Sequence, residues 1–209
     1  HYASSVFEGE RVYKGKVFKE QEHTDRLIRS AKTLGFNIPY KAEEINAIRK
    51  KVLTANKIED GYIRPISWRG SEMMGISAQT NTIHFALAAW KWPSYFSPEA
   101  KLKGIKLNIS KWRRPDPLTA PVNTKAAGLY MICTLSKHEA ESKGFDDSLM
   151  LDYRGYVAEA TGANIFFIKN NEIHTPIADC FLDGITRQTV INIARTEGIK
   201  VEEKRLNIE

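Results

Sequence analysis

Lys125 has unusual neighbours for a lysine. In the stretch NTKAAGLY, residues 123–130, it is followed by Ala126, Ala127 and Gly128 and by no second charge. Small residues let a flat ligand approach the backbone, and desolvation lowers the pKa of an amine. A lysine that becomes a neutral amine is a nucleophile for carbonyl carbons. We therefore interpret Lys125 as a candidate catalytic amine at a helix start, with an ordinary solvated lysine as the alternative.

A lone carboxylate and an anion site complement this amine. Glu159 lies in the stretch VAEATGAN, where a carboxylate among apolar and small residues is costly without a cationic partner. The stretch LDGITRQTV opens a helix with Gly184, Ile185 and Thr186. Free N–H groups, a hydroxyl and the helix dipole at such a start favour an anion. Arg26, on the helix after EHTD, can add a guanidinium to the same anion.

Each of these features has an ordinary alternative. Glu159 can pair with a nearby lysine, a glycine before a helix is a common cap, and Arg26 can be a surface residue. Their joint occurrence is harder to explain in this way. An amine, a carboxylate and a phosphate cup are the three groups that pyridoxal 5′-phosphate requires. The sequence therefore favours pyridoxal phosphate as the cofactor.

Seven stretches across nearly the whole chain form a recognisable series: HYASSVFEGERVY, EHTDRLIRSAK, GYIRPISWRG, AAWKWPSY, TKAAGLY, LMLDYRGYVAEATGANIF and LDGITRQTVI. On these stretches, which follow the family's order, the chain resembles the branched-chain amino acid aminotransferases of the class IV (fold type IV) pyridoxal-phosphate enzymes. The resemblance implies an α+β, two-domain fold type IV enzyme, similar to D-amino acid aminotransferase. It also implies that parts of the N- and C-termini are missing, including a second phosphate-binding turn beyond Glu209.

The resemblance also implies roles toward the cofactor. Lys125 matches the lysine that forms the Schiff base and moves the proton, and Glu159 matches the carboxylate that keeps the pyridine nitrogen protonated. Tyr130 matches the phenol that hydrogen-bonds the cofactor's O3′, and Leu182 matches the residue packed on the ring. The residues that match the phosphate site are Arg26, Ile185 and Thr186.

A second set of residues matches the family's substrate side. The residues implied to line an apolar side-chain pocket are Tyr2, Phe7, Tyr130 and Trp92. Tyr62 would help to hold the α-carboxylate, and Arg64 would receive the distal carboxylate of glutamate. Gly9 and Arg11 complete the FEGER turn, for which a plain hairpin is the alternative.

The implied activity is transamination between leucine, isoleucine or valine and 2-oxoglutarate, in a ping-pong sequence. The alternatives are a D-amino acid aminotransferase or aminodeoxychorismate lyase of the same fold, and a binding protein on this scaffold without turnover. The expected partners are small amino acids and 2-oxo acids, together with further copies of the chain in a homodimer or a larger assembly such as a hexamer built from dimers.

Helical spacing and turn residues predict the elements that must position these groups. The expected helices lie at 22–34, 41–56, 124–143 and 184–198. The expected strands lie at 10–19, 61–70, 81–92, 104–112, 148–160, 164–176 and 199–206, with hairpin turns at Lys14-Gly15 and Asn170-Asn171. The run 81–92 is apolar nearly throughout, which indicates a strand buried on both faces. The Pro- and Ser-containing stretch 92–104 predicts a boundary between a domain at 1–97 and a cofactor domain at 98–209.

Composition excludes several other classes. The net charge of +6 on 209 residues favours anionic partners, but the basic residues are scattered, so we do not expect nucleic-acid binding. No apolar run is long enough for a membrane span, and no signal peptide opens the chain. Cys133 and Cys180 are far apart and the histidines are dispersed, so we expect reduced thiols, no metal site and a cytoplasmic location.

Overall fold

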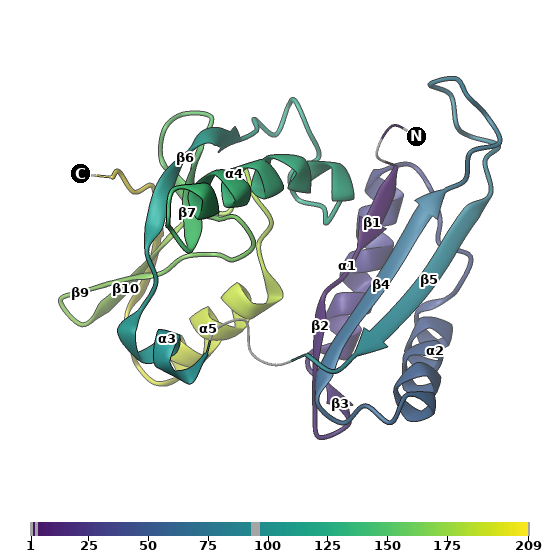
Figure 1. The fold of residues 1–209 in the computed structure, drawn as a ribbon, viewed down its shortest axis with the longest axis horizontal. Helices are drawn as coiled ribbons and strands as arrows, with labels where there is room; N and C mark the ends of the chain where they lie inside the picture. Colours follow the sequence, from purple (N-terminus) through teal and green to yellow (C-terminus); the bar gives the residue numbers. More distant parts are fainter. Residues whose placement is uncertain (1, 3, 93–96, 209) are drawn as a thin grey trace. The chain divides into compact units, whose positions relative to one another are not determined.

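The computed structural model describes residues 2, 4–92 and 97–208 (Figure 1). By its internal contacts the chain divides into two units. Unit 1 is His1–Tyr95 with Thr124–Gly128, and unit 2 is Phe96–Asn123 with Leu129–Glu209. The domain limits 1–97 and 98–209 stay a prediction, and residues 93–96 of the expected linker lie outside the described residues. The sequence did not indicate that 124–128 would join the first unit.

Unit 1 is built on a five-stranded antiparallel sheet. Its strands are β1 (Ser5–Phe7), β2 (Glu10–Tyr13), β3 (Lys16–Val17), β4 (Gly61–Arg69) and β5 (Ile83–Trp90). The long strand β4 pairs with β5 along its length, while β1 and β2 pair with different parts of β4. The predicted hairpin at Lys14-Gly15 is confirmed, because both residues adopt the positive φ that such a turn requires.

Two helices pack against this sheet, α1 (Glu20–Thr33) and α2 (Ala42–Ala55), both close to their predicted limits. Helix α1 packs Leu27 and Ala31 against Val6 of β1, and α2 contributes Leu53 to a cluster with Ile63 of β4. Because side chains alternate across a strand, Phe7, Tyr62 and Arg64 then lie on the opposite face of the sheet. The sheet therefore separates an apolar core from a face that carries polar and aromatic groups.

The prediction that β5 is buried on both faces was wrong. Phe85 and Leu87 pack toward the core, whereas His84, Ala86 and Ala88 are exposed on the opposite face. Alanine keeps the run apolar in sequence but gains little from burial, so an alanine-rich strand does not need a second covering layer.

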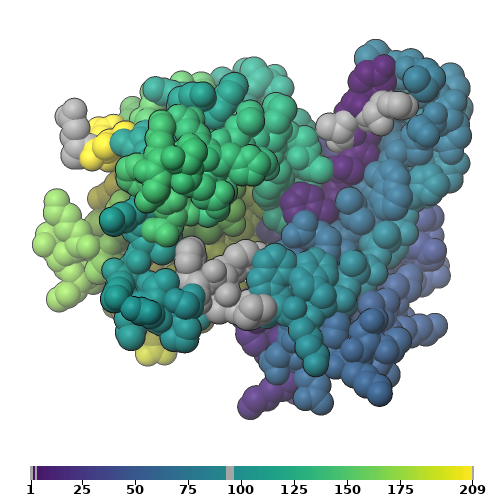
Figure 2. All heavy atoms as spheres, in the orientation of Figure 1, coloured from purple at the N-terminus to yellow at the C-terminus, as the bar shows by residue number. Residues whose placement is uncertain are grey.

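Unit 2 contains two three-stranded sheets. In the first, β6 (Leu107–Arg114) runs parallel to β7 (Asp147–Asp152), which forms a hairpin with β8 (Val157–Ala160). Helix α4 (Met131–Ser142) packs on β6 and β7 (Figure 1), and green atoms from this part of the chain form part of the surface that faces the viewer in Figure 2. The predicted hairpin 148–160 is confirmed, and it places Glu159 opposite Met150.

The second sheet of unit 2 has the order β11-β10-β9. Strands β9 (Phe167–Lys169) and β10 (Glu172–Pro176) form the predicted hairpin at Asn170-Asn171, where both residues have positive φ. Helix α5 (Ile185–Thr196) then connects β10 to its parallel neighbour β11 (Val201–Lys204). The predicted glycine boundaries of this helix are confirmed, with Gly184 at the N-cap and Gly198 at a positive φ.

The helix expected at 124–143 begins later than predicted. The turn of 3-10 helix at Ala127–Tyr130 leads into α4, and Lys125 and Ala126 precede both in extended backbone that forms an isolated bridge to β1. A short helix, α3 (Pro98–Lys103), was not predicted either and lies within the expected linker. Within the described part of the chain, we find no helix with the length and apolar character needed to cross a bilayer.

Candidate active site

The backbone of Lys125 is fixed by two elements of unit 1. Its carbonyl oxygen accepts a hydrogen bond from the Phe7 N–H at 3.2 Å, and its own N–H donates to Ser30 Oγ on α1 at 3.1 Å. Its ammonium nitrogen lies 4.8 Å from the centre of the Phe7 ring. The side chain is partly buried. The candidate amine is thus held on the aromatic face of the sheet, although its segment is neither helix nor regular strand.

The structure brings five of the predicted substrate-side residues together on this face. The Arg64 guanidinium lies 4.6 Å from the centre of the Phe7 ring and donates to the Tyr62 hydroxyl at 3.0 Å. The rings of Tyr62 and Trp92 are 5.1 Å apart, and Arg11 Nη1 donates to the Trp92 carbonyl at 2.9 Å. Arginine above aromatic rings makes a surface that accepts both apolar groups and a carboxylate.

Gly9 and Tyr2 differ in how they relate to this cluster. A Cβ on Gly9 would lie 1.9 Å from the Tyr62 hydroxyl oxygen, so only glycine permits this close approach. Tyr2, in contrast, is 60% exposed, and its hydroxyl donates to the Met74 carbonyl in the loop between β4 and β5. The close approach therefore joins Gly9 to the cluster, whereas the pocket role of Tyr2 stays a prediction.

Arg26 is not a surface residue. It is buried on α1, where Nε donates to Glu8 Oε1 at 2.7 Å and Nη2 donates to Glu8 Oε2 at 2.8 Å. His23 Nδ1 lies 2.7 Å from the same Oε2. Burial by itself would raise the pKa of Glu8, but hydrogen bonds from Arg26 and His23 lower it to about 2. This ion pair could not be predicted from the sequence, since a buried glutamate next to a turn has the same residue pattern as an exposed one.

The stability of the fold is expected to fall as the pH drops from about 5 to about 2 because Glu8 takes up a proton. Its folded-state pKa lies below the ordinary value of 4.5, so the carboxylate stabilises the fold above that value, and this contribution is lost toward the folded-state pKa. Thermal unfolding of wild type and Glu8→Gln across this range measures the effect. The difference in Tm should shrink toward low pH, and a constant difference would contradict the assignment.

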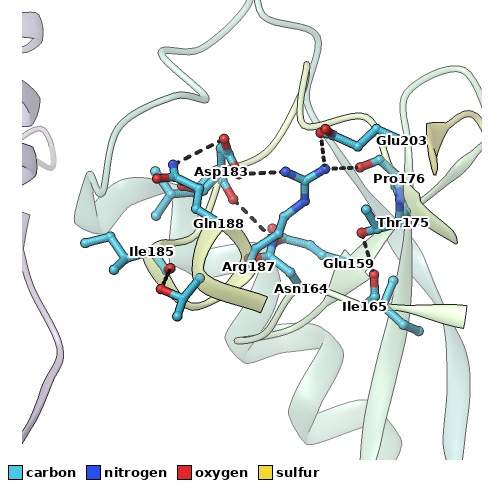
Figure 3. Close-up of polar contacts among 12 residues, drawn as sticks. Glu159, Asn164, Ile165, Thr175, Pro176, Asp183, Ile185, Arg187, Gln188 and Glu203 are labelled. Carbon is cyan, nitrogen blue, oxygen red and sulfur yellow. Dashed lines mark hydrogen bonds and ion pairs between the residues drawn. The ribbon is translucent and has the colours of Figure 1, made fainter. Parts of the chain in front are cut away.

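In unit 2, the carboxylate of Glu159 is buried and is contacted by Arg114 and by Asn164, and the contact with Asn164 is visible in Figure 3. Arg114 Nε, at the end of β6, lies 3.3 Å from Glu159 Oε1, and Asn164 Nδ2 donates to Oε2 at 3.1 Å. Asn164 also donates to the carbonyl of Leu182 at 3.2 Å. The cationic partner that the sequence required is thus provided by Arg114, which the sequence analysis did not single out. Arg114 also donates to Cys133 Sγ at 3.3 Å.

The N-terminus of α5 lies beside this carboxylate and is shaped by close contacts. A Cβ on Gly184 would lie 2.2 Å from Asn164 Oδ1, so the turn depends on glycine. Ile185 is buried, Thr186 is exposed, and Gly184 has no side chain to cap the first-turn N–H groups. Groups of this kind bind anions.

The buried side chain of Arg187 holds the turn before α5 in place (Figure 3). It is 2% exposed, and it donates to Asp183 Oδ1 at 2.8 Å, to the Pro176 carbonyl at 2.9 Å and to Glu203 Oε2 at 2.8 Å. The helix start is therefore tied to both β10 and β11. Tyr130 lies at the junction of the 3-10 turn and α4 and is partly buried.

Two groups of described residues have the donor types of a metal site, although the sequence predicts none. Asp152, Asp179 and Cys180 form the first, and there the Arg154 guanidinium bridges the two carboxylates at 2.6 and 2.7 Å. Glu172, His174 and Glu202 form the second, and there each glutamate pairs with a lysine. In both groups, positively charged side chains already pair with the carboxylates that a metal ion would need as ligands. The absence of a metal site therefore stays our prediction.

The comparisons with known proteins identify the family of the chain. Residues 5–209 match the family model described as amino-transferase class IV. The chain belongs to this family. Its predicted fold class, an α+β fold type IV enzyme, is confirmed, and the chain is a pyridoxal-phosphate-dependent aminotransferase.

Individual relatives are similar over the whole chain. A probable branched-chain-amino-acid aminotransferase of Rickettsia bellii is 50% identical over 209 residues, which are 100% of this chain and 71% of the relative. The crystal structure of the Escherichia coli branched-chain amino acid aminotransferase has a TM-score of 0.96 at 35% identity, covering 100% of this chain and 71% of that one. An aminotransferase from Brucella abortus bound to PLP has a TM-score of 0.87 at 34% identity, over 99% and 74%.

The donor groups of the chain fit pyridoxal phosphate. Unit 1 offers the Lys125 amine and the Arg26 guanidinium, and unit 2 offers the buried Glu159 carboxylate and the α5 N-terminus that begins at Gly184. These are the groups that an aldehyde, a pyridine nitrogen and a phosphate require. The predicted cofactor is therefore supported both by the family and by the chemistry of the donor set.

Proposed function

We propose that this aminotransferase exchanges the amino group between branched-chain L-amino acids and 2-oxoglutarate. The observation that carries the proposal is the aromatic face of unit 1, where the Arg64 guanidinium and the Lys125 amine both contact the Phe7 ring. Arg64 also donates to Tyr62, whose ring packs against that of Trp92. The apolar rings suit the side chain of leucine, isoleucine or valine, and one guanidinium suits the distal carboxylate of glutamate. The names of the similar proteins support branched-chain amino acids as substrates.

Each named residue has a task in this proposal. When bound, pyridoxal phosphate supplies an aldehyde that accepts the amino group and a ring that withdraws electrons. Lys125 Nζ takes the proton from the substrate Cα and returns one to the product, as a general acid and base. Glu159 holds a proton at the pyridine nitrogen, and Leu182 packs on the ring. Tyr130 donates to the ring oxygen, and the phosphate is bound by Arg26, Ile185 and Thr186.

Chemical trapping tests the proposal directly. Borohydride reduction of the purified enzyme with pyridoxal phosphate, followed by peptide mass mapping, should find one phosphopyridoxyl group on the peptide that contains Lys125. Initial rates with L-leucine, L-isoleucine, L-valine and their D-isomers then test the substrate class. A label on another lysine would overturn the role of Lys125, and faster turnover of the D-isomers would favour a D-amino acid aminotransferase.

Replacing Arg64 by alanine is expected to impair glutamate more than leucine, because only glutamate carries a second carboxylate. A charge-assisted hydrogen bond of about 1.5–3 kcal/mol predicts a loss in kcat/KM for glutamate on the order of ten- to a hundredfold. The matched control is Arg69→Ala, at the end of the same strand, where Arg69 donates to the carbonyls of Ala78, Leu34 and Gly35. Equal losses for the two donors in Arg64→Ala would count against the assignment.

We further propose that the active enzyme is cytoplasmic, on the basis of its two separate cysteines, and that it is a homodimer or a larger homo-oligomer, as the resemblance implies. Light scattering of the purified protein at several concentrations measures the assembly state. A monomer with full activity would contradict that part of the proposal.

A further inference from the structure

We propose that Glu8 is a positioning residue for the cofactor phosphate, because it fixes the guanidinium of Arg26 with its Nη1 edge available to the anion. The proposal rests on the role of Arg26 proposed above. No part of Glu8 needs to touch the cofactor, so its effect is transmitted through Arg26 alone.

The geometry of the ion pair leaves one edge of the guanidinium unused. Arg26 binds the carboxylate side-on, through Nε at 2.7 Å and Nη2 at 2.8 Å. Among the described residues, none accepts a hydrogen bond from Arg26 Nη1, and Arg26 is only 5% exposed. A guanidinium presents its N–H groups in a rigid fork, so fixing one edge also fixes the direction of the other.

Glu8 is itself held from three sides. Its backbone N–H donates to the Pro65 carbonyl on β4 at 2.9 Å, and its side chain is fully buried. His23 Nδ1 lies 2.7 Å from Glu8 Oε2. Because the pKa of Glu8 is lowered to about 2, the carboxylate is ionised at neutral pH and only accepts hydrogen bonds. The His23 Nδ1 atom therefore carries the hydrogen, and the carboxylate has little freedom to rotate.

Helix α1 links this ion pair to the candidate amine. His23 and Arg26 are three residues apart on one face of α1, and Ser30, one turn further, accepts the hydrogen bond from the Lys125 backbone N–H. Phe7, the last residue of β1 and the neighbour of Glu8 in sequence, donates its N–H to the Lys125 carbonyl. Helix α1 and the consecutive residues Phe7 and Glu8 thus hold both the Arg26 guanidinium and the backbone of Lys125.

Two opposite effects of Glu8 on phosphate affinity can be distinguished. Its negative charge partly cancels that of Arg26, which by itself weakens the attraction for an anion. Its hydrogen bonds remove the conformational freedom of Arg26, which strengthens binding. The side-on geometry and the full burial of Glu8 favour the second effect, so removal of the charge should weaken phosphate binding rather than strengthen it.

Unit 1 contains a matched ion pair that serves as a control. Glu10 and Arg49 are both fully buried, with Arg49 Nε 2.6 Å from Glu10 Oε2 and Nη2 donating to Oε1 at 2.8 Å. Arg49 lies on α2 and has no proposed contact with the cofactor. The variant Glu10→Gln therefore reports the cost of disturbing a buried pair in this unit without touching Arg26.

The test compares pyridoxal 5′-phosphate with pyridoxal, which has the same aldehyde but no phosphate. The Kd of each is measured by titration of the apoenzyme, followed by its visible absorbance band, for wild type, Glu8→Gln and Glu10→Gln. We define the preference as the Kd of pyridoxal divided by the Kd of pyridoxal 5′-phosphate. In Glu8→Gln this ratio should fall by about tenfold, which corresponds to about 1.4 kcal/mol of binding free energy. Binding of pyridoxal should change little, and Glu10→Gln should keep the wild-type preference.

An unchanged or increased preference in Glu8→Gln would overturn the proposal. If Glu8→Gln does not fold, His23→Phe removes only the N–H donor and should reduce the same preference by about threefold, the effect of part of one hydrogen bond. An unchanged preference in His23→Phe would then be decisive against the proposal. Failure of the proposed function would give a different result. In that case borohydride reduction of the wild-type enzyme with pyridoxal phosphate would not label Lys125.

Discussion

Lys125→Ala is expected to abolish transamination, lowering kcat by at least about a thousandfold, since general acid–base catalysis alone contributes about 10²–10⁴. The substitution removes the only proposed group that both binds the cofactor covalently and moves the substrate proton. It should leave the fold intact, because the hydrogen bonds from the Phe7 N–H and to Ser30 Oγ use the backbone of residue 125. Steady-state rates with L-leucine and 2-oxoglutarate measure the loss.

Two controls separate chemistry from folding in this experiment. The Tm of Lys125→Ala should stay close to the wild-type value, because the side chain is only partly buried. Lys111→Ala removes an exposed lysine on β6 and should retain full activity. Turnover by Lys125→Ala at more than about a tenth of the wild-type rate would show that another group carries the proton transfer.

The positions of turns were predicted more accurately from the sequence than any other feature of the fold. Lys14-Gly15, Asn170-Asn171 and the glycines that bound α5 were all located correctly, because a positive φ restricts which residues can occupy the position. Such restrictions act within a few residues. They can therefore be recognised without knowledge of the tertiary fold.

The position of Lys125 could not be predicted in this way. The helical pattern after it is real, yet Lys125 and Ala126 pair with β1, a segment distant in sequence. Long-range pairing of this kind overrides local helix propensity. The same limit explains the error on β5, whose alanines read as a doubly buried strand although no local signal records which elements cover each face.

Buried charges were missed for a related reason. Glu8 and Glu10 flank Gly9 in a stretch that reads as a hairpin turn, yet both are fully buried against arginines from α1 and α2. A sequence shows that a charge is present but does not show whether an opposite charge will meet it. For the same reason, the sequence did not indicate that Arg114 would be the cationic partner of Glu159.

Glu159→Gln is expected to slow transamination by on the order of a hundredfold or more, the range for loss of one catalytic electrostatic interaction. Glutamine keeps the shape of the side chain and can still accept a hydrogen bond from Asn164, but it has no charge to hold a proton at the cofactor's pyridine nitrogen. It also leaves the Arg114 guanidinium, which is 4% exposed, without its carboxylate. An uncompensated buried cation is costly, so some loss of Tm is expected as well.

The control variant must therefore lose a buried carboxylate, and with it some thermal stability, without removing a group that contacts the cofactor. Asp152 on β7 is a buried carboxylate of the neighbouring strand that pairs with Arg154 at 2.6 Å, and Asp152→Asn should lower the Tm while leaving kcat near the wild-type value. Because Glu159→Gln removes the charge that holds the ring proton, its defect should appear in kcat even with saturating cofactor. Full rescue of the rate by excess pyridoxal phosphate would reduce Glu159 to a binding residue and exclude its role at the pyridine nitrogen.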